Sequence, residues 1–126
     1  MTLILDSGAL IALERNDRAM WRRLKTSLLA NTVPLTHGGV VGQVWRGAGP
    51  RQAMLARALD GIDVRPLTDT LGRGAGELLA RSRSKDVVDA ALVLLAADGD
   101  EILTSDVDDI APLARLAGRH VDVIDA

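Results

Sequence analysis

The chain of 126 residues has no cysteine, which excludes disulfide scaffolds, thiolate zinc sites and cysteine nucleophiles. Phe and Tyr are absent and there are only two Trp, so the chain lacks an aromatic platform on which bases could stack. No apolar run approaches the length of a membrane span, and the start MTLILD has neither the basic segment nor the cleavage site of a signal peptide. We therefore expect a cytoplasmic protein that does not bind a membrane.

The charged residues are unevenly divided within each sign. Lys and Arg number 15 against 17 Asp and Glu, and this net charge of −2 predicts no strong overall attraction to nucleic acid. Lys25 and Lys85 are the only lysines, so arginine dominates the bases, as aspartate dominates the acids. Arginine is well suited to contacts with phosphate. A biased base composition of the gene is the simpler explanation for most of the arginines. It does not explain where the aspartates stand.

Short apolar runs alternate with segments of helical periodicity along the whole chain, which we read as a single domain (1–126). The runs predict strands at residues 2–5, 33–36, 62–66, 101–104 and 121–124. Spacing and capping residues predict helices at 7–14, 17–30, about 40–46, 50–59, 68–81, 86–97 and 108–117. This alternation is typical of an α/β domain with a parallel sheet.

Acidic residues follow two of the predicted strands. Asp6 closes the first strand, and Thr104 and Asp106 stand at the end of the strand at 101–104. The carboxyl ends of parallel strands meet at one rim, so we expect these side chains to converge there. Asp86 and Asp89 share a face at the start of a helix and can join them.

Converging carboxylates repel one another unless a cation neutralises them, and oxygen-only ligands favour Mg²⁺ or Mn²⁺. Helix capping alone is the competing interpretation for Asp86, Asp106 and Asp108. It does not explain Asp89, which interrupts a helix that is otherwise apolar around it. Taken together, the acids favour a metal site.

Three acidic blocks also resemble those of the PIN domain, most closely in the form of the VapC-like toxins of bacterial toxin–antitoxin pairs. The blocks are LILDSGALIAL (3–13), DVVDAALVLLAA (86–97) and LTSDVDDI (103–110). The resemblance implies a three-layer α/β/α sandwich with a central parallel sheet of four to five strands. It also implies an Mg²⁺- or Mn²⁺-dependent endoribonuclease that uses a metal-activated water, forms a homodimer and is blocked by an antitoxin.

Carried over by position, the resemblance makes Asp6, Asp89 and Asp106 the metal-binding catalytic acids. Asp108 matches a less constant acid of the family, and Ser7 and Thr104 match hydroxyl residues that line its pocket. Asp86 is an additional acid that either supports the site or caps its helix. Asp109 stands at a position that is usually bulky and apolar in the family, so we do not place it among the metal ligands.

The family's remaining acid, a glutamate after the second strand, falls in VVGQVWRG, where the residue is Gln43. An amide can ligate a metal but carries no charge and cannot act as a base. We expect activity to persist, with Asp86 or Asp108 compensating. The alternative is a catalytically weakened PIN domain that binds RNA or a protein.

Four basic side chains are candidates for guiding RNA, although ordinary solvated helix faces explain them equally well: Arg46, Arg51, Arg83 and Lys85. His37 lacks partners at ligand spacing, so we expect it to be structural. Receiver domains and haloacid-type phosphatases also place acids at such a rim. A receiver domain requires a second acid next to the first, where this chain has Ser7. A haloacid-type phosphatase requires one two residues later, where this chain has Gly8.

Overall fold

A computed structural model describes all 126 residues. Its strands are β1 (Leu3–Leu5), β2 (Leu35–His37), β3 (Asp63–Arg65), β4 (Glu101–Thr104) and β5 (Asp122–Asp125). Its helices are α1 (Ser7–Glu14), α2 (Arg18–Leu29), α3 (Gly38–Val44), α4 (Pro50–Leu59), α5 (Asp69–Ala80), α6 (Val87–Leu95) and α7 (Val107–Leu116). The predicted alternation of strands and helices is confirmed.

The strands form one parallel sheet in the order β3-β2-β1-β4-β5. The chain first moves from β1 outward to β3, and then crosses back to place β4 on the other side of β1. The switch in direction therefore lies between β1 and β4. In open parallel sheets, ligands bind beyond the carboxyl ends of the strands at this point.

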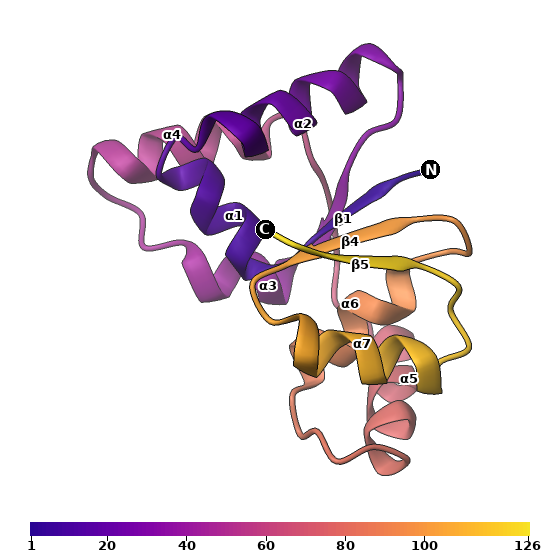
Figure 1. Ribbon diagram of the computed structural model, residues 1–126. Helices are drawn as coiled ribbons and strands as arrows, with labels where there is room; N and C mark the ends of the chain where they lie inside the picture. Colours follow the sequence, from indigo (N-terminus) through magenta and orange to yellow (C-terminus); the bar gives the residue numbers. More distant parts are fainter.

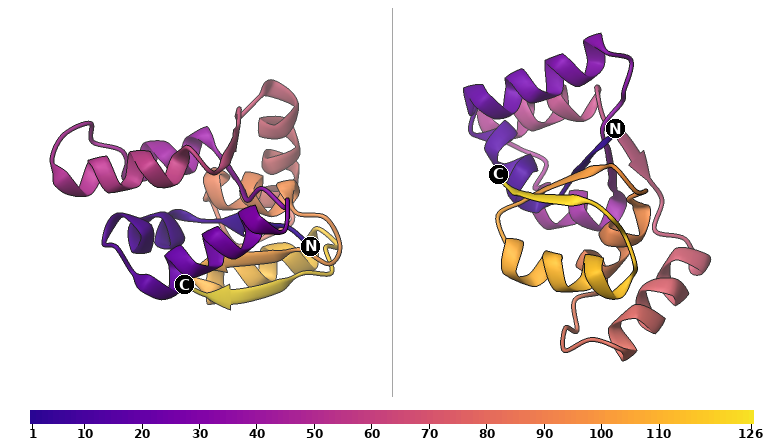
Figure 2. Two further views of the ribbon diagram at one scale, coloured as in Figure 1. Left: turned by 90° about the horizontal axis from the view of Figure 1, so that it is seen from above. Right: turned by 45° about the vertical axis from the view of Figure 1, so that its right-hand side comes forward.

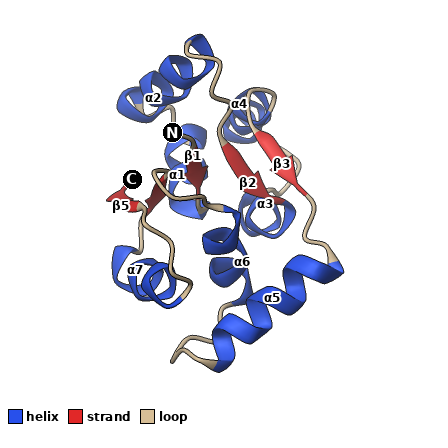
Figure 3. Ribbon diagram, turned by 90° about the vertical axis from the view of Figure 1, so that its right-hand side faces the viewer, coloured by secondary structure: helices blue, strands red, loops and turns tan.

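Helices cover both faces of the sheet, which confirms the predicted three-layer sandwich. The two helical groups lie on opposite sides of the strands in Figures 1 and 2, and Figure 3 shows the sheet between them. In one group α1 packs against α2, α3 and α4, and in the other α6 packs against α5 and α7. Apolar residues of the sheet and of both groups form a core cluster of 25 buried side chains.

Two predicted strands are displaced in the structure. The second was expected at 33–36 but begins at Leu35, the first residue that pairs with β1, because Pro34 has no N–H to donate. The last was expected at 121–124 but covers Asp122–Asp125, since it follows the register of β4 residue by residue. None of the helices is both long and apolar enough for a membrane span.

Candidate functional site

The switch point between β1 and β4 brings Asp6 and Thr104 together. The two strands pair with Leu5 opposite Leu103, so Asp6 and Thr104, the residues that follow this pair, lie at the same rim. The Thr104 hydroxyl donates a hydrogen bond of 2.7 Å to Oδ2 of Asp6. Both residues are buried, and Asp6 retains only 3% of its exposure. This hydrogen bond and the burial fix the orientation of the Asp6 side chain.

Asp6 also starts α1. Its Oδ1 accepts a hydrogen bond of 2.7 Å from the backbone N–H of Ser7, the first residue of the helix. Gly8 follows, where a Cβ would lie 2.4 Å from Oγ of Ser105 and 2.7 Å from its backbone nitrogen. Glycine is therefore required for the first turn of α1 to lie against the segment that follows β4.

The Thr104 hydroxyl also holds the segment that carries Asp106. It accepts a hydrogen bond of 2.9 Å from the backbone N–H of Asp106 while donating to Asp6. Asp106 occupies the N-cap position of α7, but its side chain makes no capping hydrogen bond. Its carboxylate instead helps to raise the pKa of Asp89 and of Asp109.

Asp89 stands in the first turn of α6 and is 8% exposed. Asp86 caps this helix, because its Oδ1 accepts a hydrogen bond of 3.1 Å from the backbone N–H of Asp89. Burial, followed by the negative charges of Asp6, Asp86, Asp106 and Asp109, raises the pKa of Asp89 to about 7. The acids therefore form one electrostatically coupled group around Asp89.

His37 fixes the first turn of α6 against the end of β2. Its Nδ1 accepts a hydrogen bond of 3.1 Å from Gly39, so Nε2 carries the proton and donates to the carbonyl of Val88 at 2.9 Å. The ring is fully buried. His37 thus has the structural role expected from the sequence, and it positions the residue next to Asp89.

The structure separates the two acids that follow Asp106. Asp109, one helical turn beyond Asp106, contributes to the raised pKa of Asp89, whereas Asp108 does not. The pKa of Asp109 is itself raised, first by its side-chain hydrogen bond to Asp106 and then by the charge of that residue. Sequence reasoning left Asp109 out, although the three-residue spacing from Asp106 was a signal that the two could meet.

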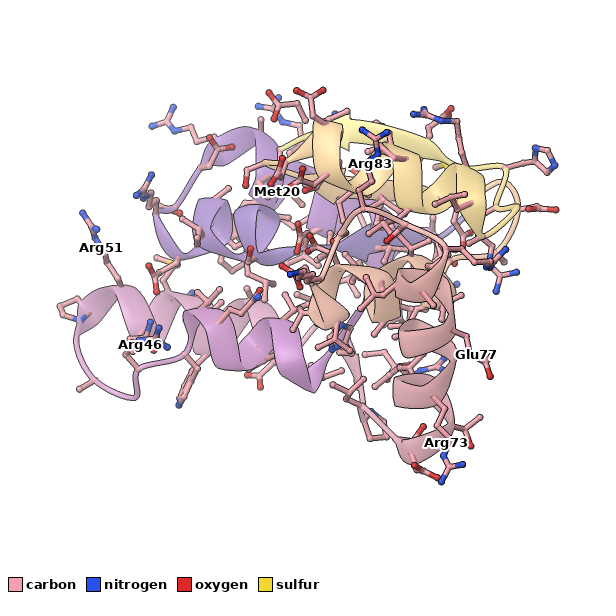
Figure 4. The ribbon with its side chains drawn as sticks, turned by 90° about the horizontal axis from the view of Figure 1, so that it is seen from below. Met20, Arg46, Arg51, Arg73, Glu77 and Arg83 are labelled. Atoms are coloured by element: carbon pink, nitrogen blue, oxygen red, sulfur yellow. The ribbon has the colours of Figure 1, made fainter.

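The remaining predicted residues lie outside this group. Gln43 is exposed on α3. The guanidinium of Arg46 donates to the carbonyls of Gly42, Gln43 and Trp45, at 2.7–3.2 Å, and so closes the end of that helix. Figure 4 places Arg46 and Arg51 near the start of α4 and Arg83 in a different part of the molecule. Arg83 and Lys85 are exposed in the α5–α6 loop.

The donor chemistry of the acid group fits a hard divalent cation. Every side chain in it is a carboxyl group, and after burial the charges of the other acids raise the pKa of Asp89. No three carboxylates lie close enough to form a preassembled metal-binding group. The residues therefore fit a cation in charge and donor type, but their side chains are not arranged as a metal-binding group in this structure.

Comparison with known proteins gives a match in structure alone. No family model matches the sequence, and no curated protein matches it. The structure is similar to a chain of VapBC2 from Rickettsia felis, solved bound to a DNA fragment from its promoter. The TM-score is 0.73 at 10% identity, and the match covers 100% of this chain and 99% of the other. The fold is PIN-like. At this identity the match establishes the architecture, and the chemistry must be argued from the side chains.

Proposed function

We propose that this chain is a divalent-cation-dependent endoribonuclease of the PIN type, with Mg²⁺ or Mn²⁺ as its cofactor and RNA as its substrate. The observation that carries the proposal is the buried Asp89, whose pKa is raised by burial and by surrounding acids. A cation beside these groups would favour their ionised forms. All-oxygen donors select Mg²⁺ or Mn²⁺ rather than zinc.

The roles follow from the positions of the side chains. Asp6, Asp89 and Asp106 would hold the cation, which when bound supplies activation of water and stabilisation of charge on the phosphate. Thr104 orients Asp6 and the backbone of Asp106 through its two hydrogen bonds. Asp109 adds a further carboxyl group beside Asp89, and we infer that it supports cation binding.

The test is RNA cleavage by purified protein across a range of Mg²⁺ and Mn²⁺ concentrations. We expect cation-dependent cleavage by the wild type and none by Asp6→Asn. The exposed Asp60→Asn, at the end of α4, is a control with the same charge change and should cleave at the wild-type rate. Cleavage that persists in EDTA, or in Asp6→Asn, would contradict the proposal.

A second candidate is a PIN-like domain that binds RNA or a protein without cutting. It is favoured by the uncharged Gln43 and by the absence of three carboxylates preassembled for a metal. Gln43→Glu discriminates between the two candidates. A gain above a measurable wild-type rate supports the nuclease. A silent wild type with activity restored in Gln43→Glu supports a domain that has exchanged catalysis for binding.

We further propose that the chain is the toxin of a toxin–antitoxin pair and acts as a homodimer in the cytoplasm. A groove of about 660 Å³ between α2 and α4 offers a surface for the antitoxin. The apolar part of the groove comes from Trp21, Leu29 and Met54. The basic side chains around it are Arg18, Arg22, Lys25 and Arg57. None of these basic side chains forms an ion pair within the chain. An amphipathic, acidic segment of the antitoxin complements such a groove in both respects.

Copurification with the product of the adjacent gene tests the pairing. Arg22→Glu with Lys25→Glu should weaken that complex by at least tenfold, because both charges would then repel an acidic segment. Arg73→Glu, in α5 and outside the groove, is the control and should bind normally. Light scattering of the free protein measures whether it is a dimer.

A further inference from the structure

A second pocket lies beside the acid group. It has a volume of about 510 Å³ and opens between the α5–α6 loop and α7. Its walls include Arg83, Ser84, Asp108, Asp109, Pro112 and Leu116. The volume is within the range of small-ligand sites. We call this cavity the loop pocket.

The loop pocket has a fixed position relative to Asp89. Ser82 organises the loop, because its hydroxyl donates to the Leu79 carbonyl at 3.1 Å and accepts from the Ser84 N–H at 3.1 Å. The Ser84 hydroxyl in turn accepts a hydrogen bond of 3.1 Å from the backbone of Asp86. Asp86 caps the helix that carries Asp89. A ligand in the loop pocket would therefore lie next to the proposed cleavage centre.

Two side chains of the loop pocket have unused hydrogen-bonding capacity. Neither the guanidinium of Arg83 nor the carboxylate of Asp108 forms a hydrogen bond or ion pair within the chain. Arg81 differs, since its Nη1 donates to the carbonyl of Leu116 at 3.4 Å. The loop pocket thus offers one free fork of donors and one free pair of acceptor oxygens.

This combination selects a base rather than a phosphate. Asp108 and Asp109 balance the charges of Arg81 and Arg83 in the lining of the loop pocket, so it has no excess positive charge to hold a phosphate group. Pro112 and Leu116 supply an apolar wall against which a flat base can lie. Among the RNA bases, guanine alone offers two adjacent acceptors, O6 and N7, for an arginine fork. It also offers two adjacent donors, N1–H and the N2 amino group, for a carboxylate.

We propose that the loop pocket binds one guanine of the RNA substrate next to the bond that is cut. Arg83 donates to O6 and N7, and Asp108 accepts from N1–H and the amino group. The inference rests on the proposed function and adds a sequence preference to it. It also gives Asp108 a role in recognition that differs from the metal-supporting role expected from the sequence.

The test uses four fluorescein-labelled pentanucleotides, UUGUU, UUAUU, UUCUU and UUUUU, with Ca²⁺ replacing Mg²⁺. Fluorescence anisotropy should show that the wild type binds UUGUU at least about fivefold more tightly than the others, the lower end for one bidentate pair. Arg83→Lys keeps the charge but loses the fork, so it should retain RNA binding and lose the preference. Asp108→Asn should reduce it. Arg73→Met, whose side chain lies away from Arg83 in Figure 4, should keep it.

The outcomes separate this inference from the proposed function. Equal binding of all four RNAs by the wild type would overturn the guanine site and leave the nuclease proposal standing. A guanine preference that survives in Arg83→Lys would also overturn the assignment. If the wild type binds none of the four RNAs, the guanine site is refuted, while the cleavage assay on longer RNA decides the nuclease independently. Thermal unfolding of each variant verifies that it is folded.

Discussion

Replacing Asp89 with asparagine should make the protein more stable at neutral pH while abolishing cleavage. The rise of the Asp89 pKa from its ordinary value of 3.8 to about 7 corresponds to about 4 kcal/mol at 1.36 kcal/mol per tenfold change. Solvent at the open rim screens part of this free energy, so we expect the unfolding free energy of the variant to exceed that of the wild type by about 2 kcal/mol above pH 7. Asparagine has nearly the same shape and never ionises, which removes the repulsion without opening a cavity.

The sign of the pH dependence follows from linkage. The folded protein binds the Asp89 proton more tightly than the unfolded chain does, so the contribution of Asp89 to stability falls as pH rises from about 4 to about 7. The difference in unfolding free energy between Asp89→Asn and the wild type should therefore be small at pH 4. It should widen through this window and reach its full value by pH 8.

Urea unfolding at pH 4, 6 and 8 in EDTA measures this difference, with Asp60→Asn as a control that should show none of it. Added Mn²⁺ should raise the stability of the wild type more than that of Asp89→Asn, because only the wild type gains from neutralisation. A difference that does not change with pH would refute the reasoning. So would an Asp89→Asn protein that is less stable than the wild type at pH 8.

Four further substitutions, in three experiments, test other parts of the structure. Asp109→Asn should reduce the rise in unfolding temperature caused by Mn²⁺ and Asp108→Asn should not; an equal effect of both would contradict the separation of their roles. Gly8→Ala should lower the unfolding free energy by about 1–3 kcal/mol, because its Cβ would overlap Ser105; a neutral effect in urea unfolding would mean that the two segments part easily. Gln52→Ala should cost about 1–3 kcal/mol, since the buried amide bonds four groups around it, and unchanged stability would show that water replaces it.

Most of the fold could be predicted from local patterns. The helix at 50–59 and the strand at 101–104 were predicted with the bounds that the structure shows, because each is delimited by its own residues. The edges of β2 and β5 were not, since pairing with neighbouring strands sets them. Strand limits depend on partners that lie far away in the sequence.

The candidate site could be predicted only in part. Asp6, Asp89 and Asp106 stand out because each follows or interrupts an apolar segment, and the structure gathers their charges. Asp109 acts on Asp89 and Asp108 does not because of the rotation of α7 about its axis. Packing of the helix against the rest of the protein sets this rotation. The bridging role of the Thr104 hydroxyl likewise depends on the register between β1 and β4.

The strand order has a consequence for how the protein is made. β1 begins at Leu3 but pairs with β4, which ends at Thr104, so the centre of the sheet cannot close until the chain through Thr104 has left the ribosome. Contacts between such distant segments form late, because the intervening chain must first be ordered. Asp6, Asp89 and Asp106 therefore meet only after the chain through Asp106 has been made and released. If the protein cuts RNA, a nascent chain that has not yet released β4 lacks the assembled acids and cannot cut the messenger from which it is translated.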